Sequence, residues 1–289
     1  MSQSLSVVET KPATSSGIAT AFATCKELGR AALMPFITAG YPTLEKSHEL
    51  LDALVAGGAD LIEIGIPFSD PLADGATVQR ASQVALEQGT SLSDAYDLVR
   101  AFRSRGHATP VVFMGYSNPF MQYGLQRLAN DAASVGVDGF IVPDLPLEES
   151  DEFSIPLRQA GRDLIFLVAP TSTDQRIREA VSRASGFIYC VSLTGVTGAR
   201  ENLAGDLGEY IARVRSHTNL PLAIGFGIST PEHVREASAL ADGVVVASAL
   251  INHIDTVESS AQADAARNFV QAMAEATGKA GEYTTMGEA

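Results

Sequence analysis

The sequence predicts an α/β protein, a single (β/α)8 barrel with one extra N-terminal helix. Eight short apolar runs typical of strands alternate with longer segments of helical periodicity, which is the signature of repeated βαβ units and a parallel sheet. The chain, 289 residues long, is also about the size of one such barrel. Eight strands favour a closed barrel over an open doubly wound sheet, although a count of strands alone does not prove closure.

The elements follow one another in a regular order. The eight expected strands are residues 31–38, 60–68, 110–116, 138–144, 163–170, 186–192, 220–227 and 242–248. Helices are expected at residues 17–30, 43–58, 91–106, 120–136, 173–185, 207–217 and 230–240. We therefore expect a disordered tail at residues 1–16, which are rich in Ser and Thr, a TIM-barrel catalytic domain at 17–278, and a flexible tail at 279–289.

Composition excludes several classes of function. The net charge of −14 disfavours binding to nucleic acid or to an anionic membrane surface. No apolar stretch approaches the roughly 18 residues of a spanning helix, and the N-terminus lacks a basic segment followed by an apolar one. We expect a cytoplasmic protein. Its cysteines, Cys25 and Cys190, fall in an expected helix and an expected strand, which indicates buried thiols rather than a disulfide framework.

The second strand carries a carboxylate at a position that faces inward. Side chains alternate along a strand, so Ile62, Ile64 and Ile66 would pack against the helices, whereas Glu63 would face the barrel interior. Burial among apolar neighbours would raise the pKa of Glu63 toward the range useful for proton transfer at neutral pH. A glutamate tolerated at a solvated strand end is an equally good interpretation of the spacing alone.

A second carboxylate follows in the loop after this strand. In barrels of this class the chemistry lies at the C-terminal ends of the strands, and the loop SDPLADG carries Asp74 over the same end as Glu63. Taken by itself, Asp74-Gly75 is better explained as turn chemistry, because Asp accepts local backbone hydrogen bonds and Gly permits positive φ.

Small residues gather at the last strand ends. The segments TGVTG at 194–198 and GFGIS at 225–229, together with Ala247-Ser248, would let backbone N–H groups approach an anion closely. Loops after the seventh and eighth strands often form a phosphate site in TIM barrels. Each segment is a weak signal alone, but three at these junctions indicate a phosphate site.

Histidine and lysine residues are not expected at the catalytic end of the barrel. The five histidines fall in expected helices or in loops that precede strands, away from the catalytic end, which argues against histidine acid/base chemistry and His-ligated zinc. The four lysines also miss every strand end, so a Schiff-base aldolase would have no nucleophile. The remaining features are paired carboxylates and a phosphate site.

Five motifs together resemble the tryptophan synthase alpha-subunit family. They are EIGIPFSDPLADG at 63–75, PFITAGYP at 35–42, IVPDLP at 141–146, SLTGVTGAR at 192–200 and GFGIS at 225–229. The resemblance spans roughly residues 20–278. It implies a lyase that cleaves indole-3-glycerol phosphate to indole and glyceraldehyde 3-phosphate in tryptophan biosynthesis. It also implies a cytoplasmic enzyme that works in an alpha2beta2 heterotetramer.

The resemblance also implies roles for individual residues. Glu63 would be the general acid/base and Asp74 would hold the indole N–H. A protonated indole ring supplies the electron sink for a retro-aldol step, so neither a metal nor a cofactor is needed in this chain. The implied substrate-binding residues are Phe36, Tyr116, Tyr189, Thr197, Gly198, Gly227, Ala247 and Ser248. Plain core packing is a rival interpretation for the three aromatic residues.

The family's partner is a PLP-dependent beta subunit. By resemblance, its contact residues would include Pro71, Asn118 and Pro146. Two positions depart from the family pattern: Ala76 stands where a proline is usual, which should loosen the loop before it, and Ala247 stands where a glycine is usual, which could crowd a phosphate. Two other functions remain open: a stand-alone lyase or other phosphate-binding barrel enzyme, and a catalytically silent subunit.

Overall fold

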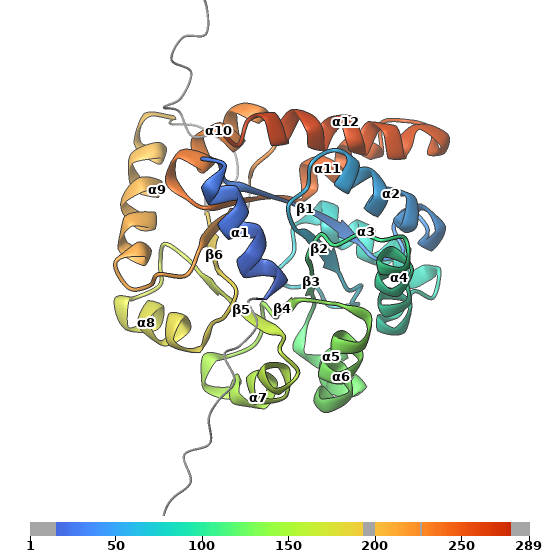
Figure 1. Ribbon diagram of the computed structural model, residues 1–289, viewed down its shortest axis with the longest axis horizontal. Coiled ribbons are helices and arrows are strands. Elements are labelled where there is room, and N and C mark those ends of the chain that lie inside the picture. The colour runs from blue at the N-terminus through green and yellow to red at the C-terminus, as the bar shows by residue number, and fades with distance from the viewer. Residues whose placement is uncertain (1–15, 193–199, 226, 279–289) are drawn as a thin grey trace, which may run out of the picture.

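Eight parallel strands form a closed barrel surrounded by helices (Figure 1). The computed structural model describes residues 16–192, 200–225 and 227–278. Strand order around the barrel follows the sequence, and β1 closes the ring by pairing with β8. The strands are β1 (Ala32–Thr38), β2 (Ile62–Gly65), β3 (Val111–Met114), β4 (Gly139–Ile141), β5 (Asp163–Val168), β6 (Ile188–Val191), β7 (Leu222–Gly225) and β8 (Gly243–Val246). The predicted fold class is therefore confirmed, and each strand lies within its expected range.

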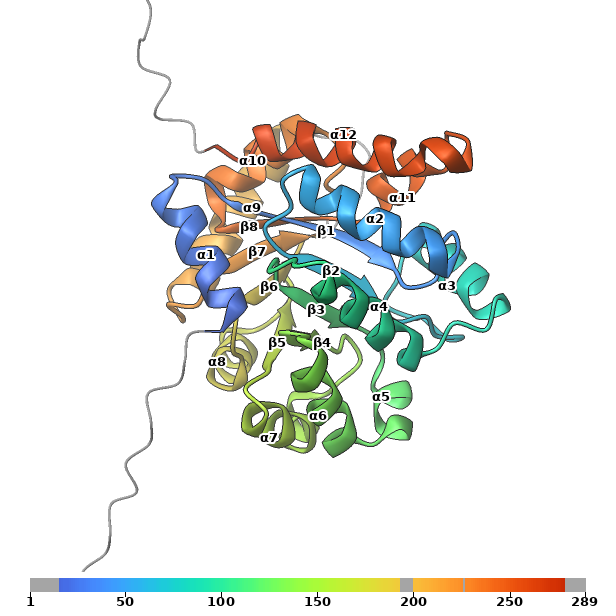
Figure 2. The same cartoon turned by 45° about the vertical axis from the view of Figure 1, so that its right-hand side comes forward.

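Helices follow the strands around the outside (Figure 2). In chain order they are α1 (Gly17–Glu27), α2 (Leu44–Ala56), α3 (Ala76–Glu87), α4 (Leu92–Ser104), α5 (Ser117–Tyr123), α6 (Leu125–Val135), α7 (Asp151–Gln159), α8 (Asp174–Arg183), α9 (Arg200–Arg215), α10 (Pro231–Leu240), α11 (Ser248–Ile254) and α12 (Gln262–Glu275). Short 3-10 turns lie at Leu147–Glu149 and Ser259–Ala261. No helix in the described part of the chain is long and apolar enough to cross a membrane.

The alternation predicted for the second strand holds. Ile62, Ile64 and Ile66 belong to the large core between the strands and the outer helices. Leu61, two positions before Glu63, belongs to the separate core inside the barrel. A period of two along the strand therefore aims the Glu63 side chain into the barrel.

Helix α1, the expected extra helix, closes the N-terminal end of the barrel. It crosses in front of the strands in Figure 1, and Ile18, Phe22 and Cys25 on its buried face join the interior core. The Phe22 ring lies 5.6 Å from that of Phe187 at the start of β6. Ser16 caps α1 by accepting a hydrogen bond from Ala19 N, so it belongs to the helix rather than to the expected tail.

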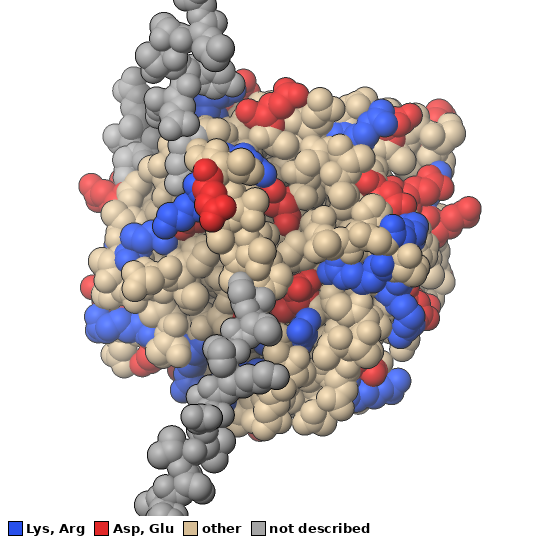
Figure 3. Space-filling view, in the orientation of Figure 1, with Lys and Arg blue, Asp and Glu red and all other residues tan. Residues whose placement is uncertain are grey.

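Polar side chains pin the same N-terminal end of the strands. An Asp or Ser residue lies just before each of β2, β4, β6 and β8. Its side-chain oxygen accepts a hydrogen bond from a backbone N–H near the start of the strand before it, which is β1, β3, β5 or β7. The pairs, at 2.9 to 3.1 Å, are Asp60 with Leu33, Asp138 with Val111, Ser185 with Leu164 and Asp242 with Leu222. Figure 3, which looks onto this end, shows side chains of both charges among uncharged ones. With α1 covering this end, the opposite end is left for a binding cavity.

Two features of the helices differ from the prediction. The single helix expected over 120–136 is two helices, because Gly124 at φ 91° and ψ 118° breaks the chain between α5 and α6. Helices α3, α7, α11 and α12 were not among the expected elements. Both cysteines are free and buried, as expected. The expected tail residues 1–15 and 279–289 lie outside the described residues, so the tails and the proposed domain limits stay predictions.

Candidate active site

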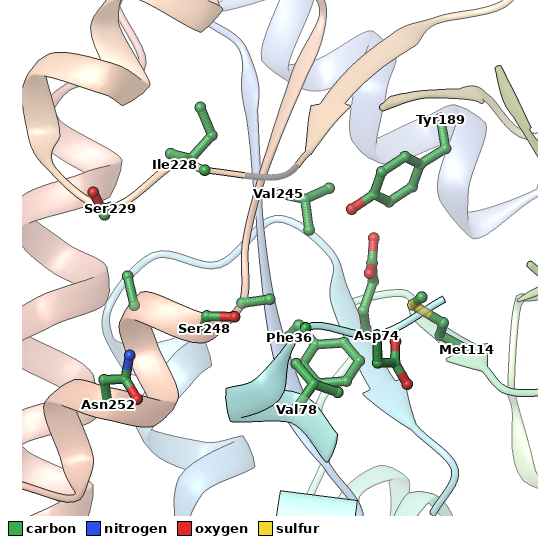
Figure 4. A pocket seen from close by; sticks show the side chains of 15 residues that line it. Phe36, Asp74, Val78, Met114, Tyr189, Ile228, Ser229, Val245, Ser248 and Asn252 are labelled. Atoms are coloured by element: carbon green, nitrogen blue, oxygen red, sulfur yellow. The ribbon is translucent and has the colours of Figure 1, made fainter. Parts of the chain in front are cut away.

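One cavity of about 260 Å³ opens at the C-terminal ends of the strands. Figure 4 shows Phe36, Tyr189 and Asp74 around one end of this cavity, with Ile228, Ser229, Ser248 and Asn252 around the other. The remaining residues that line it are Glu63, Gly75, Val78, Met114, Gly227, Val245, Ala247 and Ala249. The cavity therefore has a carboxylate end walled by aromatic rings and a second end built from small and hydroxyl residues.

Glu63 lies at the carboxylate end and is only 1% exposed. Neither of its side-chain oxygens has a hydrogen-bond partner among the described residues. Because the surroundings do not solvate a charge, burial raises the pKa of Glu63 from 4.5 to about 8. This carboxyl group therefore keeps its proton at neutral pH and can deliver it to a bound molecule, which excludes the alternative of a solvated strand end.

Asp74 lies in the loop between β2 and α3, directly before Gly75, the N-cap residue of α3. The Tyr116 hydroxyl accepts a 2.9 Å hydrogen bond from the backbone N–H of Ala73, which ties this loop to the end of β3. Burial raises the pKa of Asp74 to about 6, and a hydrogen bond with Tyr116 opposes the rise. At neutral pH Asp74 is mostly ionised while Glu63 is mostly protonated, so the two carboxyl groups suit different tasks.

Two glycines make room for the aromatic rings. A Cβ atom on Gly65 would lie 2.4 Å from Phe36 Cζ, and one on Gly225 would lie 2.0 Å from the Tyr189 hydroxyl oxygen. Both rings face the cavity in Figure 4. Small residues on β2 and β7 therefore let these two rings line the cavity beside the carboxyl groups.

The other end of the cavity is electrically neutral. Among the described residues that line the cavity there is no Lys, Arg or His. Gly227 has a φ of 78°, a left-handed conformation that favours glycine. Ala247 has a φ of −117°, so its methyl group causes no strain of that kind. Backbone N–H groups, the hydroxyls of Ser229 and Ser248 and the Asn252 amide are the donors that the described residues of this end offer to an anion.

Most of the predicted site residues come together here. Glu63, Asp74, Phe36, Tyr189, Gly227, Ala247 and Ser248 all line the cavity. Tyr116 lines a small adjoining chamber, which it shares with Phe36 and Asp74. Thr197 and Gly198 lie outside the described residues.

The three predicted partner-contact residues lie beyond the ends of three neighbouring strands. Pro71 follows β2, Asn118 follows β3 and Pro146 follows β4. Asp144 ties two of these segments together, because its carboxylate accepts hydrogen bonds from the N–H and the hydroxyl of Ser117. Asn118 and Pro146 are exposed and Pro71 is partly exposed.

One histidine is closer to the site than predicted. His233 is in the first turn of α10, and its Nδ1 lies 3.3 Å from the hydroxyl of Ser229, which lines the cavity. Helices that follow strands begin at the catalytic end, so a histidine near such a helix start comes back toward the cavity. The statement that every histidine lies away from this end is therefore wrong for His233.

Sequence reasoning missed several residues that line the cavity. Ile228 and Ser229 stand inside the quoted GFGIS motif but were not singled out. Asn252 lies four residues after Ser248, the spacing that puts two side chains on one face of a helix, and this signal could have found it. Val78 and Met114 carried no signal beyond their apolar character. The described residues contain no group of three or more His, Cys, Asp or Glu that could hold a metal ion.

Comparisons with known proteins agree with this geometry. Residues 22–280 match the family model of the tryptophan synthase alpha chain. The chain is 53% identical over 258 residues to the tryptophan synthase alpha chain of Roseiflexus sp. (strain RS-1), covering 89% of this chain and 99% of the relative. It is 49% identical over 257 residues to that of Chloroflexus aggregans, covering 89% and 96%.

Solved structures give the same result. Tryptophan synthase subunit alpha from Legionella pneumophila superposes with a TM-score of 0.84 at 36% identity, covering 91% of this chain and 98% of that one. A chain of Mycobacterium tuberculosis tryptophan synthase superposes with a TM-score of 0.83 at 34% identity, covering 92% and 99%.

Proposed function

The chain belongs to the tryptophan synthase alpha chain family and is a lyase of tryptophan biosynthesis, and we propose that Glu63 and Asp74 are its catalytic pair. The alpha reaction cleaves indole-3-glycerol phosphate into indole and glyceraldehyde 3-phosphate. The observation that carries the assignment is the buried Glu63 carboxyl beside an aromatic-walled cavity. It has no hydrogen-bond partner in the described part of the chain, and its pKa is about 8.

Glu63 would act first as an acid and then as a base. Its proton goes to the indole ring carbon that bears the glycerol chain, and this leaves the ring cationic. The resulting carboxylate takes the proton of the hydroxyl group on the adjacent side-chain carbon. The carbon–carbon bond then breaks, its electron pair returns to the ring, and the aldehyde forms. Glu63 ends protonated, so one residue serves both steps.

Asp74 would stabilise the charge that the ring gains. The ionised carboxylate would accept a hydrogen bond from the indole N–H. This hydrogen bond becomes stronger as the nitrogen gains positive charge in the transition state. Since the pKa of Asp74 is about 6, it has the required charge at neutral pH. The protonated ring itself is the electron sink, so we propose a reaction without a cofactor in this chain.

The rest of the substrate fits the remainder of the cavity. The indole ring would lie between Phe36 and Tyr189, and the phosphate would receive hydrogen bonds at the end formed by Gly227, Ala247 and Ser248. Tyr116 would act from the adjoining chamber by holding Asp74. We assign Gly198 to the phosphate and Thr197 to a contact with Asp74 by family resemblance alone.

We propose that the partner is a PLP-dependent beta subunit in an alpha2beta2 assembly. It would dock on the surface around Pro71, Asn118 and Pro146, which the barrel brings to one end. Leu72, beside Pro71, is 93% exposed. An exposed apolar side chain at this place is consistent with a surface that a partner covers. The cytoplasmic location stays a prediction.

Indole release from indole-3-glycerol phosphate tests the proposal. The purified chain should turn over slowly alone and much faster with a matching beta subunit. Fast turnover alone, with no gain from the partner, would indicate a stand-alone lyase, and no turnover in either case would indicate a silent subunit. Glu63→Gln should abolish cleavage without unfolding the chain; cleavage within about tenfold of wild type would contradict the role of Glu63.

A further inference from the structure

The neutral end of the cavity carries one amide whose role is unassigned. Asn252 lies one helical turn after Ser248 on α11, and both side chains line the cavity (Figure 4). Side chains four residues apart on a helix stand about 5–6 Å from one another at Cβ. Asn252 is therefore within reach of a group bound at Ser248, on the open side of the cavity.

The orientation of this amide is determined by the neighbouring helix. The hydroxyl of Thr77, in the first turn of α3, donates a 3.2 Å hydrogen bond to Asn252 Oδ1. With the oxygen engaged by Thr77, the Nδ2 group is left to donate elsewhere. In the described part of the chain, no residue accepts a hydrogen bond from this nitrogen.

A second polar link holds the two helices together. Arg80 Nη2, one turn after Thr77, forms a 2.5 Å ion pair with Asp255 Oδ2 at the end of α11. The buried Tyr41 hydroxyl donates to Asp255 Oδ1 at 2.6 Å and accepts from Arg80 Nη1 at 2.6 Å. Helices α3 and α11 are therefore braced, and the Thr77 hydroxyl keeps its place relative to Asn252.

A phosphate bound here needs such donors. Because no cation lines the described part of the cavity, the described residues offer a phosphate dianion only neutral N–H and O–H donors. Hydrogen bonds from neutral donors to a charged acceptor are stronger than neutral pairs, so each additional donor contributes appreciably to affinity.

We propose that Asn252 is a further substrate-binding residue, whose Nδ2 donates to the phosphate group of the substrate while Thr77 holds the amide in place. This inference rests on the proposed function and names one more residue of the same site. It also gives a direct link between the two ends of the cavity, because Thr77 lies three residues after Asp74.

Asn252→Asp separates this role from a purely structural one. An aspartate still accepts the hydrogen bond from Thr77, so a structural role would leave the enzyme unchanged. A phosphate contact, by contrast, loses its donor and gains a repelling charge. We expect the KM for indole-3-glycerol phosphate to rise at least about tenfold while kcat stays within about twofold of the wild-type value. The ratio of the variant KM to the wild-type KM should fall in high salt, because salt screens the added charge.

Binding of inorganic phosphate and of glycerol 3-phosphate, measured by calorimetry, gives a readout that does not depend on catalysis. Both should bind Asn252→Asp at least about tenfold more weakly than wild type, and Asn252→Ala about tenfold more weakly. Free indole, which has no phosphate, should bind all variants equally. Thr77→Val should weaken phosphate binding less, and its effect should disappear in an Asn252→Ala background.

Asn130→Asp is the matched control. Asn130, on the exposed face of α6, also accepts a side-chain hydrogen bond, from Gln126 at 3.1 Å, and its substitution adds the same charge. It should bind phosphate as wild type does. If the wild-type chain cleaves its substrate and Asn252→Asp binds phosphate with wild-type affinity, this inference is overturned and the proposed function stands. A wild-type chain that neither cleaves the substrate nor binds phosphate would overturn the proposed function together with it.

Discussion

Glu63→Gln should inactivate the enzyme and at the same time stabilise it. The ordinary pKa of the glutamate is 4.5, and burial raises it to about 8 in the folded chain. Between these values the unfolded chain carries the carboxylate while the folded chain keeps the proton. The folded state therefore binds more protons, and the free energy of unfolding of the wild type falls as the pH rises. Glutamine is neutral in both states and has no such dependence.

The size of the effect follows from the two pKa values. Each pH unit between them costs the wild type about 1.4 kcal/mol, so the cost is about 3 kcal/mol at pH 7 and about 5 kcal/mol above pH 8. The difference in unfolding free energy between Glu63→Gln and wild type should therefore grow by about 2.5 kcal/mol from pH 5 to pH 7. Cleavage should fall by about two to four orders of magnitude, the usual contribution of a general acid or base.

Urea unfolding of both proteins at pH 5, 6, 7 and 8 provides the measurement. Glu236→Gln, at an exposed position on α10, is the control. Its curve of unfolding free energy against pH should run parallel to that of wild type. If the curve of unfolding free energy against pH had the same slope for Glu63→Gln as for wild type, Glu63 would not be the desolvated acid that the geometry indicates. The catalytic role derived from its pKa would then lose its basis.

Three further outcomes can be checked on the same protein. The pH profile of kcat/KM should be bell-shaped with limbs near 6 and 8, because Asp74 must lose its proton and Glu63 must keep its own; a profile flat from pH 5 to 9 would contradict this assignment. Asp74→Asn should lower the single-turnover cleavage rate about 100- to 1000-fold, and a loss below about fivefold would argue against charge stabilisation at the ring nitrogen. Gly225→Ala should lower kcat/KM more than about tenfold, because its Cβ would lie 2.0 Å from the Tyr189 hydroxyl oxygen and force the ring into the cavity. Gly208→Ala, whose nearest neighbour would be 3.8 Å away, is the control and should behave as wild type does.

The sequence determined the strands and the direction of their side chains. Apolar runs with a period of two, such as the one around Ile62 and Ile64, specify which face packs on the helices, because a shift by one residue would turn the whole set toward the barrel interior. Eight such runs separated by helical segments are enough to indicate the barrel, and the position of Glu63 in its run is enough to aim it inward. Helix limits were predicted less well, because the break at Gly124 depends on one backbone conformation that glycine permits but does not require.

The environment of each carboxyl group was decided by the tertiary structure. The spacing around Glu63 fitted a solvated strand end as well as a buried acid, and only packing of the barrel interior removes water from both of its oxygens. Asp74-Gly75 is common turn chemistry, and the pKa of Asp74 is raised because the loop folds over the cavity and buries its carboxyl group, while a hydrogen bond with Tyr116, 42 residues away, opposes the rise. Contacts such as Thr77 with Asn252, 175 residues apart, join helices that the sequence places at opposite ends of the chain. Local pattern specifies which way a side chain points, because it depends on backbone geometry alone. Burial, pKa and long-range partners depend on which surfaces meet when the barrel closes.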